Sequence, residues 1–163
     1  MQLHVTYPDA SKCAEYLWKN PVRARKMITE TQQILACAQK HFFGGVTLLK
    51  VNGEPFKTPK SRMNHPVVKW VCEDMRHFIW VYHYLRFLYL GYDGKGFLNV
   101  RNNLLTLHYL CWVPGNYVKM DEIEKGKGIE FFNFAKADSK GLDFTHIKDV
   151  HLAYRMFLEA QEG

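Results

Sequence analysis

The sequence predicts a mainly α-helical fold: a compact single-domain helical bundle around a central apolar helix, with space for a small β-hairpin. Three observations lead to this expectation. Apolar residues recur at helical spacing over several long segments, and Asn, Asp, Pro and Gly stand where those segments begin and end. One internal segment is apolar on almost every side, which is typical of a buried helix. The length of 163 residues suits one domain, so we expect residues 1–163 to fold together.

The N-terminal quarter predicts an extended segment followed by two helices. Residues 3–7 are expected to form a short strand or an extended lead-in, and Tyr7-Pro8-Asp9 predicts a turn. Asp9 is a candidate N-cap for a helix over residues 10–17. Asn20-Pro21 then starts a longer helix with proline in its first turn, and we expect that helix to end at about His41, ahead of a Gly-Gly pair.

The next segment predicts the hairpin and a basic loop. Residues 46–51 and 54–58 flank Asn52-Gly53, a pair that favours a tight hairpin turn. Pro55 lacks a backbone N–H, so the second arm can only lie at an edge. We expect residues 57–62, which carry three cations, to continue as a loop.

The central helix is predicted from about His65 to Leu90. Asn64 is its candidate cap, and Pro66 stands in its first turn. Apolar residues cover most of its sides and scattered charges interrupt them, so we expect it to be buried in the middle of the protein. Beyond it we expect a turn over 92–96, a helix over 97–112 and a loop over 113–128. Residues 129–145 are ambiguous, with a strand or extended segment at 130–134. A final helix is expected over 147–160.

Composition and missing motifs exclude several classes of protein. Lys plus Arg number 22 and Asp plus Glu 16, a net charge of +6 that favours an anionic partner such as nucleic acid. Four widely spaced cysteines without a CxxC pair indicate reduced thiols and a cytoplasmic location. We see no signal peptide and no apolar run near the roughly 20 residues of a membrane span. Metal-ligand spacings and phosphate-loop motifs are also missing, so we expect no metal, no cofactor and no membrane partner.

The most informative run covers residues 23–35, where one carboxylate stands among three cations. At about 100° per residue, Arg23, Lys26, Glu30 and Gln33 fall on one stripe, and apolar core residues fall on the neighbouring face. Two interpretations stay open. A half-buried carboxylate among cations can act on a polyanion. Alternatively, a Lys26–Glu30 pair four residues apart can simply stabilise a solvated helix face.

A second candidate lies at the predicted start of the central helix. Asn64 and His65 follow the cations Lys60 and Arg62. The free amides and partial positive charge of a helix N-terminus suit a phosphate, and His65 could hydrogen-bond it. The alternative is structural, with Asn64 as a cap and His65 packed against the helix.

Aromatic residues are the third group of candidates. Trp70 lies on the central helix, where aromatic side chains could stack on an extruded base. Such residues at helical spacing more often form the core. Tyr7 stands beside the turn that leads toward residues 23–35, and we regard it as a better ligand candidate.

Three motifs together carry a resemblance. Tyr7-Pro8-Asp9, the run Arg23-x-x-Lys26-x-x-x-Glu30-Thr31-x-Gln33-Ile34-Leu35, and Asn64-His65-Pro66-x-x-x-Trp70 resemble the pyrimidine-dimer DNA glycosylase family (endonuclease V type) and a group of uncharacterised phage proteins related to it. In the phage group, an aromatic-rich stretch follows, here residues 76–80, and the chain closes with a helix like that of Ala153-Tyr154-Arg155.

The resemblance implies an all-helical DNA-repair enzyme that excises damaged pyrimidines and then cleaves the backbone. Glu30 aligns with the family's catalytic carboxylate. The amine of Met1, expected to be retained before the bulky Gln2, would be the nucleophile, with the Lys26 amine as a second candidate. Double-stranded DNA would be the partner, and its phosphates and bases would meet Arg23, Arg25, Lys26, Tyr7, Lys60, Arg62, Asn64, His65 and Trp70.

Two other functions stay open. The chain could be a phage protein that binds nucleic acid or a nucleotide on the same scaffold without catalysis. It could instead target a host protein through its aromatic surface. The sequence leaves the lesion, the base and the oligomeric state undetermined.

Overall fold

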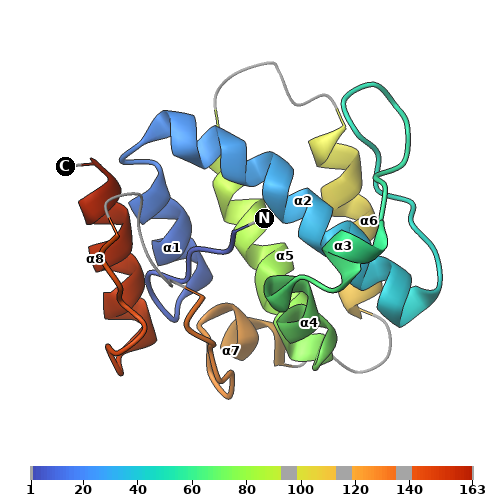
Figure 1. The fold of residues 1–163 in the computed structure, drawn as a ribbon. Coiled ribbons are helices and arrows are strands. Elements are labelled where there is room, and N and C mark those ends of the chain that lie inside the picture. Colours follow the sequence, from blue (N-terminus) through green and yellow to red (C-terminus); the bar gives the residue numbers. More distant parts are fainter. Residues whose placement is uncertain (1, 93–98, 113–118, 135–140, 163) are drawn as a thin grey trace.

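Helices make up most of the structure, as the sequence predicts (Figure 1). The computed structural model describes residues 2–92, 99–112, 119–134 and 141–162. The helices within these ranges are α1 (Ala10–Leu17), α2 (Pro21–Phe43), α3 (Lys60–Met63), α4 (Pro66–Cys72), α5 (Met75–Leu90), α6 (Val100–Trp112), α7 (Met120–Glu124) and α8 (Val150–Glu162). Their side chains form one cluster of buried apolar residues that draws on most of them.

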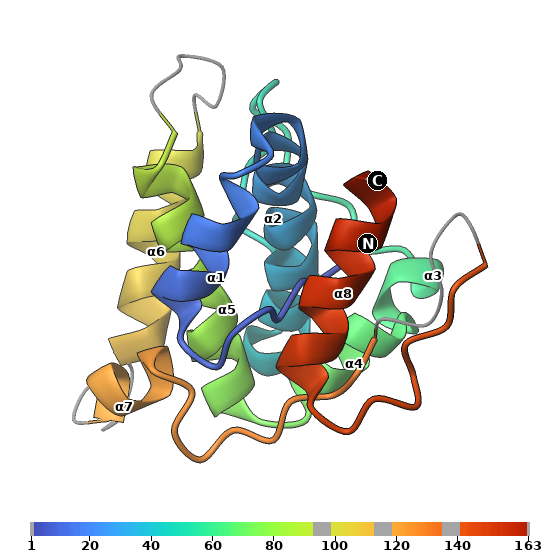
Figure 2. The same ribbon diagram turned by 90° about the vertical axis from the view of Figure 1, so that its left-hand side faces the viewer.

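The central apolar helix is α5. Its residues 77–85 are buried without interruption, which confirms the prediction of a core helix. Five helices (α1, α2, α4, α6 and α7) pack against it, and the two views show it running through the middle of the bundle (Figures 1 and 2). Trp80 and Tyr84, two of its largest side chains, stack with ring centres 5.6 Å apart.

The first two helices begin where the sequence predicts. Asp9 accepts hydrogen bonds from the backbone amides of Ser11 and Lys12, and so caps α1. Asn20 accepts from the amide of Arg23 at the start of α2, with proline in the first turn. The second helix runs slightly past His41, to Phe43, and ends at Gly44 in the left-handed conformation (φ 81°).

The predicted helix from His65 to Leu90 is wrong in one respect, because it is broken into α4 and α5. Asp74 adopts an extended conformation between them, and its carboxylate accepts a hydrogen bond from the amide of Arg76 at 2.8 Å. A short acidic side chain that bonds its own backbone competes with helix continuation. The predicted cap is also wrong, since Asn64 ends α3 and the side chain of His65 caps α4.

The predicted hairpin is reduced to a single antiparallel bridge between Leu49 and Pro55. Backbone bonds from Lys50 to Glu54 and from Phe56 to Leu48 close the loop around it. Pro55 supplies no N–H, which limits how far a ladder can extend. Within the described ranges no strand is longer than this bridge, and residues 130–134 have no regular secondary structure, so the strand expected there is not formed.

Two short helices replace parts of predicted loops. α3 lies in the predicted basic loop, and α7 lies in the predicted loop over 113–128. α6 begins at Val100, whereas the predicted helix began at residue 97. Residues 97 and 98 and most of the predicted turn over 92–96 fall outside the described ranges. The last helix begins at Val150, after Asp149, whose carboxylate accepts from the amides of His151 and Leu152.

Candidate nucleic-acid site

Three of the predicted site residues line one pocket, and we name it the Glu30 pocket. It encloses about 550 Å³. From α2 it takes Arg23, Lys26 and Glu30, the stripe that the helical spacing predicts, apart from Gln33. Its full lining comprises Gln2, His4, Asn20, Val22, Arg23, Lys26, Met27, Glu30, Phe157 and Gln161.

The local structure of α2 explains this arrangement. The first turn is held by the Asn20 cap, so successive turns present Arg23, Lys26 and Glu30 on the same side. Met27 is buried at the base, while Arg23 and Glu30 are half-buried and Lys26 is exposed. Arg23 also donates a hydrogen bond to the side-chain oxygen of Gln161 at 3.3 Å, across to α8. The pocket therefore combines one carboxylate and two cations at the border between core and solvent.

The N-terminal segment forms the second wall. Residues 3–6 are buried, and Figure 2 shows this segment running between α8 and the rest of the bundle. His151 of α8 hydrogen-bonds the carbonyl of Val5 through Nδ1 at 2.7 Å, and Arg155 donates to the carbonyl of Thr6 at 2.7 Å. These contacts hold the segment in place and bring Gln2 and His4 to the pocket. Met1, the predicted nucleophile, lies outside the described residues.

His4 is the least solvated polar side chain of the pocket. It is 4% exposed, and its ring lies against Tyr154 and Phe157, with centres 6.2 Å and 6.4 Å away. Burial, together with the positive charges of Arg23 and Lys26, lowers the pKa of His4 to about 3. His4 is therefore a neutral imidazole at ordinary pH.

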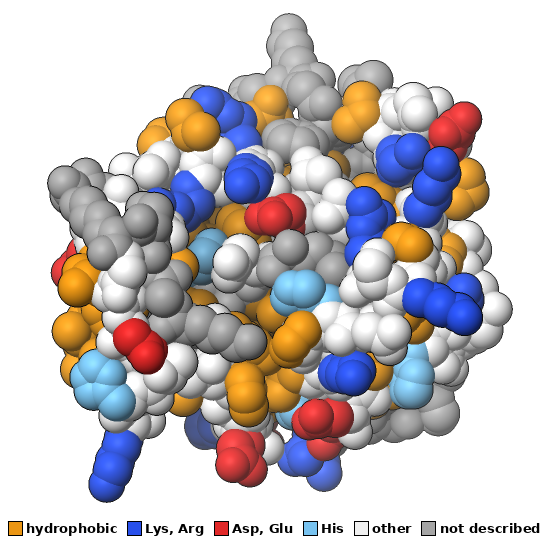
Figure 3. Space-filling view, viewed as in Figure 1, with side chains coloured by type: hydrophobic (Ala, Val, Ile, Leu, Met, Phe, Trp, Pro, Cys, Tyr) orange, Lys and Arg blue, Asp and Glu red, His pale blue; other side chains and the backbone are white. Residues whose placement is uncertain are grey.

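The other predicted phosphate-binding cations, Arg25, Lys60 and Arg62, lie outside the pocket. α3 and the N-terminal segment lie on one side of α2 in both ribbon views (Figures 1 and 2). On that face, Lys and Arg side chains gather over α2 and the segment between α2 and α3 (Figure 3). Arg62 donates to the carbonyl of Lys57 at 3.0 Å, and Lys60 is exposed. Arg25 is exposed on α2 and does not line the Glu30 pocket.

The start of α4 offers less to a phosphate than the sequence predicts. Nδ1 of His65 accepts a hydrogen bond from the amide of Val67 at 3.2 Å, so that amide is already paired. Asn64 is exposed at the end of α3 and makes no cap for α4. Neither residue lines the Glu30 pocket.

The two aromatic candidates lie apart from Glu30. Trp70 is 4% exposed, stacks on His77 with ring centres 4.0 Å apart, and donates to the carbonyl of Glu130 at 3.1 Å. This environment favours packing for Trp70. Tyr7 is half-buried under the guanidinium of Arg155, and it lines a separate pocket with Tyr16 and two lysines of the first helix region.

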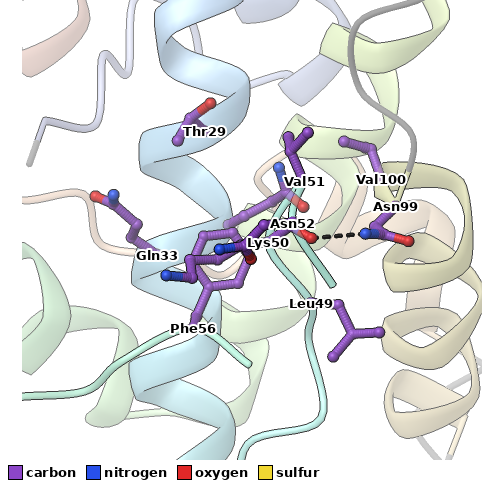
Figure 4. Close-up of a pocket in the computed structure, with 10 residues that line it drawn as sticks. Thr29, Gln33, Leu49, Lys50, Val51, Asn52, Phe56, Asn99 and Val100 are labelled. Atoms are coloured by element: carbon purple, nitrogen blue, oxygen red, sulfur yellow. Dashed lines mark hydrogen bonds between the residues drawn. The ribbon is translucent and has the colours of Figure 1, made fainter. Parts of the chain in front are cut away.

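A second pocket of about 400 Å³ lies one helical turn further along α2. Figure 4 shows Thr29 and Gln33 of α2 on one side, the bridged loop on another, and Asn99 at the start of α6. Asn99 donates to the carbonyl of Lys50 at 2.6 Å, which closes one end (Figure 4). Gln33, the fourth residue of the predicted stripe, thus belongs to this pocket.

Sequence reasoning missed the residues that the ends of the chain contribute, namely Gln2, His4, Phe157 and Gln161. One signal was present, because Gln2, His4 and Thr6 alternate with Leu3 and Val5 and would share one face of an extended segment. Nowhere in the described ranges do three or more His, Cys, Asp or Glu side chains gather where they could hold a metal ion. None of the described helices combines the length and the apolar character that crossing a bilayer requires.

Comparisons with known proteins give no match: no family model matches the chain, and neither a curated protein nor a solved structure does.

Proposed function

We propose that this protein acts on DNA as a base-excision glycosylase, with an accompanying abasic-site lyase activity. One observation carries the proposal. The carboxylate of Glu30 shares a pocket with Arg23, Lys26 and the N-terminal end of the described chain. A glycosylase of the pyrimidine-dimer type needs a carboxylate, cations and an amine together in one site. The basic face around the pocket supports a double-stranded DNA partner.

The charges of the pocket suit this chemistry. Arg23 and Lys26 would bind the phosphates on either side of the target nucleotide. When an amine attacks the anomeric carbon of the sugar, the glycosidic bond breaks and the base departs with the bonding electrons. Positive charge develops on the sugar, and the carboxylate of Glu30 would stabilise it and accept the proton that the amine loses. The sugar ring then opens: the bond between C1′ and O4′ breaks, O4′ takes a proton from the carboxyl group of Glu30, and C1′ forms a Schiff base with the amine. Loss of a proton from C2′ then allows elimination of the 3′ phosphate.

Two amines are candidates for the nucleophile. Gln2 lines the pocket, which supports the amine of the preceding residue, Met1, as the first candidate. An α-amino group has a pKa of about 8, so part of it is neutral and nucleophilic near pH 7. Lys26 is the second candidate, because it also lines the pocket.

Borohydride trapping tests the proposal. The protein would be mixed with duplexes that contain an abasic site, a thymine dimer or no lesion, and reduction would fix any Schiff base as a covalent adduct. We expect an adduct with wild-type protein and its loss in Glu30→Gln. Glu73→Gln, which changes an exposed carboxylate at the end of α4, should trap like the wild type. Folded wild-type protein that gives neither adduct nor cleavage would refute the enzyme proposal.

The same assay separates the two nucleophiles. Lys26→Arg keeps the positive charge and removes the primary amine, so trapping should survive if the N-terminal amine reacts. A short Gly-Ser extension before Met1 should abolish trapping in that case. The reverse pattern would assign the reaction to Lys26.

The alternative of a non-catalytic nucleic-acid-binding protein draws support from the same basic face. Salt-dependent binding of duplex DNA without adduct or cleavage would favour it. Glu30→Gln would then keep or strengthen binding, since it removes a negative charge from the surface that faces the phosphates.

A further inference from the structure

His4 lines the Glu30 pocket, and one of its two ring nitrogens, Nδ1, has no hydrogen-bond partner among the described residues. This nitrogen is buried. Buried polar atoms are nearly always hydrogen-bonded, and an unpaired one lowers stability. An apolar residue would suit this position better, with the rings of Tyr154 and Phe157 against it. The fold alone therefore gives no reason for a histidine here.

We infer that His4 is a substrate-binding residue of this pocket, whose neutral imidazole hydrogen-bonds an oxygen of the sugar held beside Glu30. The inference rests on the proposed function, since it takes the ligand to be a nucleotide of DNA. Three observations carry it: His4 lines the pocket, its ring nitrogen is unpaired, and α8 fixes the ring.

The neutrality of His4 matters for the carboxylate opposite. The charged groups on the pocket wall are Arg23, Lys26 and Glu30, all from α2, and Tyr154 of α8 packs edge-on against the His4 ring. An imidazolium here would offset the negative charge of Glu30. A neutral imidazole offers one donor and one acceptor and adds no further positive charge beside Glu30.

The orientation of the ring comes from the last helix. Tyr154 meets it edge-on at an interplanar angle of 76°, and Phe157 stacks at 29°. Phe157 also lines the pocket, so it bounds both the ring and the ligand space. A ring fixed by packing presents each nitrogen in a fixed direction, which is what selective recognition of a single oxygen needs.

Two variants and one control test the inference. His4→Phe keeps an aromatic ring but removes both nitrogens, and His4→Gln restores a hydrogen-bonding side chain. His146→Phe changes an exposed histidine and serves as the control. The readouts are the Kd for a duplex with a tetrahydrofuran abasic analogue, which cannot react, and the single-turnover trapping rate on a true abasic duplex.

We expect His4→Phe to weaken binding or slow trapping about 10-fold, the loss of one net hydrogen bond, while its melting temperature stays equal or rises. His4→Gln should recover part of the loss, and His146→Phe should match the wild type. If the wild type traps and His4→Phe traps at the same rate, this inference is overturned and the proposed function still stands. A wild type that neither binds nor traps would overturn both.

Histidine-ring NMR of the wild type covers the case in which His4→Phe does not fold. The ring nitrogen signals of His4 should shift when the tetrahydrofuran duplex is added, and those of His146 should not. Bound duplex with unmoved His4 signals would overturn the inference.

Discussion

Arg155 donates a hydrogen bond to the backbone carbonyl of Thr6 at 2.7 Å, and its guanidinium lies 4.6 Å from the centre of the neighbouring Tyr7 ring. A charged donor on a helix thus holds the backbone of an extended segment that would otherwise have few partners. His151, one turn earlier, makes a parallel contact to Val5. The Ala-Tyr-Arg motif of α8 therefore has a structural role, because it positions the segment that forms one wall of the Glu30 pocket.

Replacing Arg155 by methionine should destabilise the protein. The change keeps most of the apolar stem and removes both the hydrogen bond to Thr6 and the contact with the Tyr7 ring. We expect the free energy of unfolding to fall by about 1.5–3 kcal/mol, as for hydrogen bonds from charged donors. Urea denaturation measures this directly. Arg101→Met, at an exposed position on α6, should change it by less than about 0.5 kcal/mol, and equal losses in the two variants would contradict the assigned role.

Asn103 should be the most sensitive polar position of the core. Its amide donates to the side chain of Gln32 at 2.6 Å and to the carbonyl of Leu49 at 2.8 Å, and its oxygen accepts from the amide of Leu49 at 2.9 Å. Asn103→Ala leaves buried groups on both partners unpaired, so we expect a loss of about 2–4 kcal/mol in urea denaturation. Asn102→Ala, exposed on the same helix, is the matched control and should cost less than about 1 kcal/mol.

Stability should fall in mild acid because of two buried histidines. Burial lowers the pKa of His4 to about 3, with help from Arg23 and Lys26, and burial beside Arg86 lowers that of His83 to about 3. Their pKa in the unfolded chain is about 6.5. Between these values the unfolded state binds more protons, so the stability is fully present above about pH 6.5 and is lost as the pH falls toward 3.

Urea denaturation at a series of pH values checks this expectation. Each histidine contributes a slope of at most about 1.4 kcal/mol per pH unit in that window. His4→Phe should reduce the slope because it removes one of the two groups. An unchanged slope would mean that the pKa of His4 does not differ between the folded and the unfolded protein.

Salt dependence should distinguish the two arginines beside Lys26. If DNA lies over the Glu30 pocket, Arg23→Gln should weaken binding of any duplex and reduce the slope of log K against log salt by about 1. Arg25→Gln should have a smaller effect, because Arg25 does not line the pocket. Fluorescence anisotropy at several salt concentrations gives both slopes. A larger change for Arg25→Gln would place the DNA on the opposite flank of α2.

Local sequence signals predicted the parts of the structure that local interactions determine. The Asp9 cap and the helix start at Asn20-Pro21 depend on neighbours within a few residues, and both were predicted correctly. Of the four residues in the predicted stripe, Arg23, Lys26 and Glu30 line one pocket and Gln33 lines another. The break before α5 is also local, but its signal was ambiguous. Asp74 could be a single solvated charge within one continuous helix, or it could cap the start of a second helix. Only the packing on either side decides between these two.

The second wall of the pocket could not be predicted in the same way. His4 and Phe157 come from segments far apart in the sequence, and the periodicity of a single segment carries no information about such a partner. The same reason explains Trp70, whose place in the core depends on His77 and on the later residue Phe131. Distant packing therefore decided which aromatic and polar residues border the pocket.

The pocket also has an order of assembly. Its walls come from opposite ends of the chain, and the contact between Arg155 and Thr6 spans 149 residues of sequence. Contacts of such separation form only after a long loop closes, and a protein is synthesised from its N-terminus. A growing chain on the ribosome thus carries the cations and carboxylate of α2 well before α8 has emerged to hold the N-terminal segment against them. Any activity of this pocket therefore begins only when the last helix docks.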